Sequence, residues 1–281
     1  MKKKHKRGLV ILSVMALPLL LAGCGTSNVT AHSTGIWDHY VIWNFIRAIE
    51  WLSHLFGNNY GWGIIVFTVI VRIIILPLMF YQNKSMRKTT ELQPQFKALQ
   101  AKYPDARTDP DQARAMQEEQ QKLYADAGIS PVAGCLPMLV QMPVLIALYQ
   151  AIFRSPVLKS GHFFWMELGD KDPYYIMPIL AALFTFLTSY LSMMSQPEQN
   201  GMTKIMTYGM SIMTFIMAIN FPAALSLYWM ITNAFSVGQI LLISNPFKIR
   251  REREEQERQA KEAQRKKRKA RQKALKNRKK G

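Results

Sequence analysis

Residues 61–81 read GWGIIVFTVIVRIIILPLMFY, and this stretch decides the fold class. A helix of about 20 mostly apolar residues crosses the roughly 30 Å of hydrocarbon in a bilayer, so the segment predicts a membrane span. Arg72 lies near its middle. A charged side chain at that depth costs roughly 2.5–3.5 kcal/mol on insertion scales and normally faces a water-filled cavity or an interior partner. Arg72 is therefore the first candidate functional residue.

Four further apolar runs predict four more spans, at roughly 132–153, 174–194, 204–221 and 223–243. Their interiors contain no Asp, Glu, Lys, Arg or His, so none of them offers Arg72 an ion-pair partner. We therefore expect that partner to come from outside the chain. Only Pro222 separates the last two runs, which predicts a tight antiparallel hairpin.

Basic residues set the expected orientation in the membrane. The formal net charge is +18, and residues 248–281 alone hold 17 Lys and Arg against five Asp and Glu. The loop 82–131 is also rich in Lys and Arg, whereas the opposite side carries only Arg47, Arg154, Lys159 and Lys171. Since cytoplasmic loops carry the excess of basic residues, we expect the N-terminus outside and the C-terminus in the cytoplasm of a plasma-membrane protein.

The N-terminus has the three parts of a secretory signal in order. Five basic residues precede the apolar stretch Leu9–Leu21, and Leu21-Ala22-Gly23-Cys24 resembles a bacterial lipobox. That resemblance implies a signal peptide at 1–23, cleavage before Cys24 and acylation of Cys24, with palmitate as the expected fatty acid. An uncleaved signal anchor is the alternative. Cys135 would then lack a mate, so we predict no disulfide.

Residues 24–57 are expected to form an extracytoplasmic segment with an amphipathic helix. Apolar residues recur at helical spacing within Ile36–Phe56, and charged residues are interleaved. This pattern favours a helix that lies on the membrane surface.

The loop 82–131 predicts a cytoplasmic antiparallel helical hairpin. Lys84–Tyr103 and Pro110–Ala127 are rich in helix-forming residues, Pro104 and Pro110 interrupt them, and Gly128 closes the second helix. An apolar stripe on the first helix comprises Leu92, Phe96, Leu99 and Tyr103.

The tail 248–281 is a charge run. We expect Arg250–Lys266 to be capable of forming a helix and Lys266–Lys280, nearly all basic, to be disordered alone. The tail could bind anionic membrane lipids or the RNA of the ribosome. A simple topology anchor is the alternative.

Several spans carry polar residues on one face, among them Gln141 in the second and Asn233 in the fifth. The third carries Thr185, Thr188, Ser189 and Ser192, the fourth Thr203, Thr207, Ser211 and Thr214, and the fifth also Ser226, Trp229 and Ser236. Each face alone could serve helix packing. Together with Arg72 they indicate a shared wet interior.

Methionines at helical spacing in the fourth span suggest an adaptable apolar surface, with lipid-facing filler as the alternative. The stripe consists of Met202, Met206, Met210, Met213 and Met217.

Sequence motifs of enzymes are missing. The spans contain no carboxylate or histidine for a proton relay, and the chain has no P-loop, no HExxH and no metal-ligand cluster. We therefore predict neither an enzyme nor a cofactor or metal site.

Two long stretches resemble the YidC/Oxa/Alb family of membrane protein insertases. Residues 130–152 read SPVAGCLPMLVQMPVLIALYQAI, and residues 221–239 read FPAALSLYWMITNAFSVGQ. Arg72 followed by Pro77 and a charged hairpin fits the same pattern, so the resemblance covers about residues 57–247. A lipobox in place of an uncleaved first span is similar to the Gram-positive form.

The resemblance implies an all-α polytopic core at 58–247, with five transmembrane helices around a hydrophilic groove. It implies that Arg72 is the positive centre of the groove and that Gln141 and Trp229 line it. We add Asn233, which lies one turn from Trp229. The implied function is an insertase and chaperone for small or short-tailed membrane proteins, acting alone or with the Sec translocon, and contacting the ribosome through its tail. A small-solute transporter and an assembly factor that holds subunits without inserting them are the alternatives.

Overall fold

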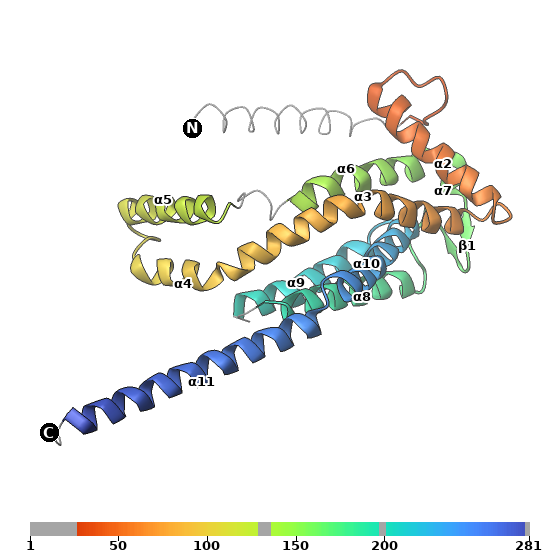
Figure 1. Cartoon of the computed structure of the whole chain (residues 1–281). Helices are drawn as coiled ribbons and strands as arrows, with labels where there is room; N and C mark the ends of the chain where they lie inside the picture. The colour runs from red at the N-terminus through yellow and green to blue at the C-terminus, as the bar shows by residue number, and fades with distance from the viewer. Residues whose placement is uncertain (1–26, 129–135, 197–200, 279–281) are drawn as a thin grey trace.

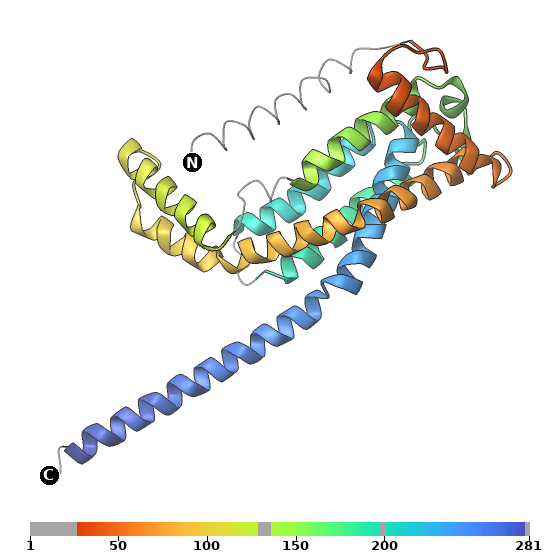
Figure 2. The ribbon, with the colours of Figure 1, turned by 45° about the horizontal axis from the view of Figure 1, so that its top comes forward.

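The computed structural model describes residues 27–128, 136–196 and 201–278, and these are almost entirely helical. Long helices lie roughly parallel in a bundle (Figure 1). A helical hairpin of α4 and α5 lies beyond one end, the hairpin end, and α2 with a small β-turn covers the other, the α2 end (Figure 2). In order, the elements are η2 (Asp38–Ile42), α2 (Trp43–His54), α3 (Tyr60–Glu91), α4 (Gln93–Lys102), α5 (Pro110–Asp126), α6 (Leu136–Phe153), α7 (Pro156–Lys159), β1 (His162–Phe163), β2 (Met166–Glu167), α8 (Ile176–Met194), α9 (Gly201–Ala218), α10 (Ala223–Ile243) and α11 (Pro246–Arg278).

Each of the five predicted spans coincides with a helix. Within the described residues, three helices are long and apolar enough to cross a membrane: Tyr60–Asn83, Ile176–Met194 and a helical stretch that begins at Ala223. Two shorter apolar helices, Val140–Phe153 and Thr207–Ala218, occupy the positions of the second and fourth predicted spans.

Helix α3 continues well past the predicted end of its span. It runs unbroken for 32 residues, which is about 48 Å at a rise of 1.5 Å per residue. The first part of the predicted hairpin helix therefore belongs to α3, α4 continues beyond it, and α5 folds back alongside α4 (Figure 2).

The hairpin of α4 and α5 follows the local signals in the sequence. The Asp109 side chain caps α5 by accepting a hydrogen bond from the Asp111 N–H. Gly128 follows the helix at φ +63°, which favours glycine. Leu99 is buried, and the rings of Phe96 and Tyr124 lie 5.0 Å apart. The apolar stripe therefore packs between the two helices.

An ionic contact also joins the two hairpin helices. Lys102 Nζ lies 2.5 Å from Glu119 Oε1, and the Tyr103 hydroxyl donates to the same oxygen at 2.9 Å. These hydrogen bonds, chiefly the one from Lys102, lower the pKa of the Glu119 carboxyl.

Helix α8 lies between α9 and α10 and packs along both of them. The short connection between α9 and α10 is tight, and Ser226 Oγ donates to the Ala218 carbonyl at 3.1 Å across it. Beyond this turn the two helices hardly touch. The predicted tight turn between α9 and α10 is therefore confirmed, but the two helices pack mainly on α8 rather than on each other.

Helix α2 presents its apolar face to the bundle rather than only to a membrane surface. Ile46 and Ile49 of α2 are fully buried, as is Ile42 at the end of η2, and α2 packs against α3 and α6. The expected surface helix is thus part of the core. Sequence periodicity shows an apolar face but not what covers it.

Helix α11 projects away from the bundle and is helical through Arg278 (Figure 1). The expectation that Lys266–Lys280 is disordered is wrong for residues 266–278. Lys, Arg, Gln and Ala are all good helix formers. Glu254 pairs with Arg250 at 2.7 Å in the first turns, which favours the helix further.

Candidate functional site

A cavity of about 490 Å³ lies inside the bundle between α3, α6, α8, α9 and α10. It forms because α6 packs mainly on α2 and α7 at the α2 end and touches α3 and α10 only sparsely. Apolar groups make up most of the wall surface, and many lining residues also carry a polar group: Thr68, Arg72, Gln82, Gln141, Thr185, Thr214, Tyr228, Trp229, Thr232, Asn233 and Ser236.

Arg72 reaches the cavity from the middle of α3 and is only 8% exposed. Its Nη2 donates to Gln141 Oε1 at 3.4 Å, and its Nη1 lies 3.6 Å from Met79 Sδ. Both partners are neutral. No carboxylate in the described parts of the chain lies within ion-pair distance of this guanidinium.

Gln141 connects Arg72 to Tyr228. Its Oε1 accepts from Arg72, and its Nε2 donates to the Tyr228 hydroxyl oxygen. Because one amide serves both neighbours, α3, α6 and α10 are linked through a single side chain on the cavity wall. This link holds the guanidinium in place without neutralising it.

Tyr228 and Gln82 are wall residues that sequence reasoning missed. Tyr228 is buried to all but 3% and lies directly before Trp229. A tyrosine inside a span was a usable signal, since a buried phenol normally needs a hydrogen-bond partner. Gln82 is also buried and lines the cavity, one residue beyond the predicted end of the first span.

The structure brings all four sequence-predicted groove residues to this cavity. Arg72 comes from α3, Gln141 from α6, and Trp229 and Asn233 from α10. Asn233 Nδ2 donates to the Trp229 carbonyl at 2.9 Å, which fixes the two on adjacent turns. The indole of Trp229 lies edge-on to Phe221, 5.8 Å between ring centres.

The predicted polar faces divide between two environments. Thr185, Thr214 and Ser236 line the cavity, whereas Thr207 and Ser211 are buried in the packing of α9. Thr185 and Ser236 each donate to the carbonyl four residues earlier. Their donors are therefore satisfied, and their oxygens can still accept from water.

The methionine stripe of the fourth span also divides. Met210 lines the cavity together with Met142 of α6. Met213 and Met217 are exposed on the surface of the bundle, which is the position expected for filler against lipid.

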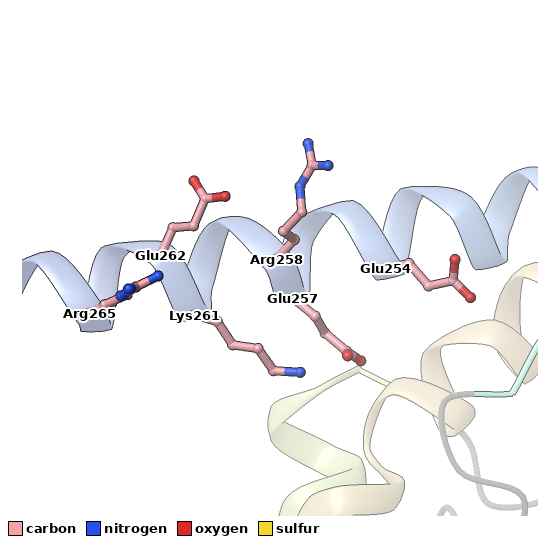
Figure 3. A pocket seen from close by; sticks show the side chains of 6 residues that line it. All are labelled: Glu254, Glu257, Arg258, Lys261, Glu262 and Arg265. Atoms are coloured by element: carbon pink, nitrogen blue, oxygen red, sulfur yellow. The ribbon is translucent and has the colours of Figure 1, made fainter.

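Two other predicted features lie elsewhere. Cys24, the predicted lipidation site, and Cys135 lie outside the described residues. The charged residues shown in Figure 3, Glu254 to Arg265, all come from α11 and project from that single helix. They form an open charged face rather than an enclosed site.

A family model and the similar proteins described below all belong to one class of membrane protein. Residues 51–252 match the model of a family described as 60Kd inner membrane protein. The chain is 57% identical over 256 residues to a membrane protein insertase YidC of Pediococcus pentosaceus, across 90% of this chain and 91% of the relative. It is 55% identical over 253 residues to a protein of the same name from Enterococcus faecalis, across 90% of each chain.

A solved structure is also similar. It is described as an active YidC insertase with the first transmembrane domain resolved, and it matches with a TM-score of 0.57 at 28% identity. The match covers 73% of this chain and 46% of the other, so this chain spans about half the length of that structure.

Proposed function

Because the chain belongs to the 60Kd inner membrane protein family, with YidC insertases among its relatives, we propose that it inserts small or short-tailed proteins into the plasma membrane. It is a multi-pass membrane protein, and we infer that all five apolar helices cross the bilayer. In this topology the hairpin end and α11 lie in the cytoplasm, and the α2 end lies outside. Acylation of Cys24 would add an outer lipid anchor.

One observation carries the mechanism: Arg72 is buried on the wall of a cavity that several polar side chains line, and its partners are all neutral. A buried guanidinium without a counter-charge favours an acidic group brought from outside. We propose that an acidic residue in the substrate's hydrophilic tail pairs transiently with Arg72. The pairing is weak, because desolvation of both charges offsets much of the Coulomb gain.

Substrate entry follows the geometry of the cavity. A nascent chain first contacts the hairpin of α4 and α5, and its hydrophilic tail enters the cavity beside Gln82. The apolar segment of the substrate moves into lipid past α6, which touches α3 and α10 only sparsely. Burial of that segment in hydrocarbon drives the tail across the membrane.

Insertion into liposomes that hold only this protein tests the proposal. The substrate is a single-span protein with an acidic tail, and the readout is protection of the tail from external protease. We expect wild type and Arg72→Lys to insert it and Arg72→Ala to fail. Arg47→Ala is the matched control, since Arg47 is exposed on α2, away from the cavity.

The other outcomes separate the alternatives. Equal insertion by wild type and Arg72→Ala would contradict the charge-attraction mechanism and leave insertion intact. Failure of wild type would favour an assembly factor that holds subunits, or an insertase that depends on the Sec translocon or the ribosome.

A further inference from the structure

Six aromatic rings form a continuous row at the α2 end of the bundle, the aromatic ladder. Consecutive ring centres lie 6.0, 6.0, 4.3, 5.9 and 6.4 Å apart. In order the rings belong to Phe56, Trp62, Phe163, Phe164, Trp165 and Tyr174. The ladder thus joins the start of α3 to the start of α8 through the turn between β1 and β2.

Most of the ladder is exposed. Phe163 is buried and serves as its inner support, whereas Phe164 is 71% and Tyr174 66% exposed. Trp62 and Trp165 are also exposed, with indole rings that combine an apolar body and one polar N–H.

Hydrogen bonds fix the ladder in place. The buried Asp172 carboxylate accepts from the Trp165 indole N–H at 2.9 Å, from the Tyr174 N–H at 3.1 Å and from the Met177 N–H at 2.7 Å. One carboxylate therefore holds two ladder residues against the first turn of α8. Exposed aromatic rings that hydrogen bonds hold in one position indicate a surface that binds an apolar partner.

We propose that the aromatic ladder sits in the headgroup region of the outer leaflet and fixes the depth of the bundle. Trp and Tyr are enriched at that boundary, where their amphipathic rings are most stable. Exposed aliphatic side chains follow the ladder along the same helices, such as Ile70 and Ile73 on α3 and Ile179 on α8. Because α3 and α8 are both long and apolar enough to cross a membrane, these exposed side chains favour lipid as the occupant over a second copy of the chain.

The number of residues between the ladder and the cavity gives similar distances along α3 and α8. Arg72 follows Trp62 by ten residues, which is about 15 Å along α3. Thr185, which lines the same cavity from α8, follows Ile176, the first residue of that helix, by nine residues, or about 14 Å. Both therefore lie near the middle of a hydrocarbon layer of about 30 Å.

The distance to the opposite boundary of the hydrocarbon layer is consistent with this depth. Tyr81, an exposed aromatic residue, follows Trp62 by 19 residues, or about 29 Å along α3. A ladder anchored at the outer boundary of the membrane thus holds the Arg72 guanidinium at the middle of the hydrocarbon layer. The proposed insertase function gives no such role to residues outside the cavity.

Tryptophan fluorescence in vesicles tests the ladder without any substrate, so its result is independent of the insertion assay. The full chain is reconstituted in phosphatidylcholine with nitroxide-labelled lipid, the nitroxide lying either near the headgroup or near the acyl terminus. The fluorescence of the wild type minus that of Trp62→Phe gives the signal of Trp62, and Trp165→Phe gives that of Trp165 in the same way. Both variants keep an aromatic ring. Trp37→Phe is the control, because its indole packs against the core and donates to Gln150.

We expect the Trp62 and Trp165 signals to be quenched about twofold more strongly by the shallow nitroxide than by the deep one, as boundary residues should be. The double variant Phe164→Ser/Tyr174→Ser should lower that ratio for Trp62. Equal quenching by both lipids would overturn the proposal. Absence of quenching, with wild type cross-linking as a dimer through the ladder, would overturn it in favour of contact between copies.

Discussion

At the scale of single residues, the two arginines that are buried in the described part of the chain have opposite surroundings. Arg72 has neutral neighbours, whereas Arg154 is 3% exposed and binds both carboxylate oxygens of Asp38, at 2.9 and 2.6 Å. Arg154 Nε also donates to the Ser27 carbonyl at 2.8 Å. The paired arginine therefore clamps the N-terminal segment to the end of α6, and the unpaired one faces a cavity.

Coulomb attraction at an effective dielectric constant of about 20 gives roughly 4 kcal/mol for two charges 4 Å apart. The loss of hydration offsets much of this. In the proposed mechanism a substrate carboxylate beside Arg72 therefore binds and leaves, whereas a permanent acidic partner on the chain would occupy the guanidinium. The neutral partners of Arg72, Gln141 and Met79, are consistent with that proposal.

Breaking the Arg154 clamp should destabilise the fold. Arg154→Met leaves the Asp38 carboxylate partly buried without its partner, and we expect a loss of up to about 3 kcal/mol in the free energy of unfolding. Thermal unfolding in detergent should show a lower Tm. Arg250→Ala breaks an exposed pair with Glu254 and should change stability by at most about 1 kcal/mol.

The double variant Arg154→Met/Asp38→Leu separates charge from packing. It should recover much of the Tm lost in Arg154→Met, because the unpaired carboxylate is gone. An unchanged Tm in Arg154→Met would contradict the clamp.

At the scale of elements, sequence periodicity located the apolar helices and the hairpin well. Apolar runs fixed the positions of α3, α8 and α10, and Asp109, Pro110 and Gly128 marked the ends of α5. These features are local. The partners of each helix are not local, so the place of α8 between α9 and α10 and the burial of Ile46 on α2 could not be predicted.

In the candidate site, too, local features could be predicted from the sequence and contacts between distant residues could not. The charge of Arg72 inside an apolar run was visible in the sequence, and a family resemblance supplied Gln141 and Trp229. The hydrogen bond between Gln141 and Tyr228 joins residues 87 positions apart. No pattern of spacing predicts such a contact, which depends on how α6 and α10 pack.

Close packing of α2 on α3 depends on Gly63. A Cβ at this position would lie 2.0 Å from Ser53 Oγ and 2.7 Å from the Ile49 carbonyl oxygen. We expect Gly63→Ala to push α2 away and to lower the free energy of unfolding by about 1–3 kcal/mol, as overpacking typically does. The measurement is the Tm in detergent.

Gly209→Ala is the matched control for that substitution. Gly209 lies within α9, and nothing lies within 4 Å of a Cβ there. It should leave stability unchanged or raise it by up to about 1 kcal/mol, because Ala favours a helix more than Gly does. Equal effects of the two substitutions would contradict the close approach of α2 and α3.

At the scale of the whole molecule, the hairpin and α11 both extend from the same end of the bundle (Figures 1 and 2). Arg253 of α11 donates to the Ser195 carbonyl at the end of α8, at 2.7 Å, which ties the base of α11 to the core. Beyond this contact, residues 254–270 of α11 are exposed. Its basic residues are therefore available to an anionic partner at the cytoplasmic face in the proposed topology.

Removing residues 258–281 should leave the bundle folded and weaken binding to that partner. Co-sedimentation with ribosomes and with anionic vesicles, each over a range of salt, distinguishes the two sources of phosphate. We expect ribosome binding to fall at least about tenfold in the truncated chain, with a shallower salt dependence, since fewer phosphates are neutralised. Unchanged binding to both would leave the tail as a topology anchor.

The most direct test of the central claim is a coupling measurement between Arg72 and the substrate's tail. Insertion rates into liposomes are measured for wild type and Arg72→Ala, each with an acidic-tailed substrate and with the same tail carrying the corresponding amides. We expect Arg72→Ala to slow the acidic substrate at least about tenfold, equivalent to about 1.4 kcal/mol, and to leave the amide substrate nearly unchanged. An equal effect of Arg72→Ala on both substrates would contradict attraction between Arg72 and the tail.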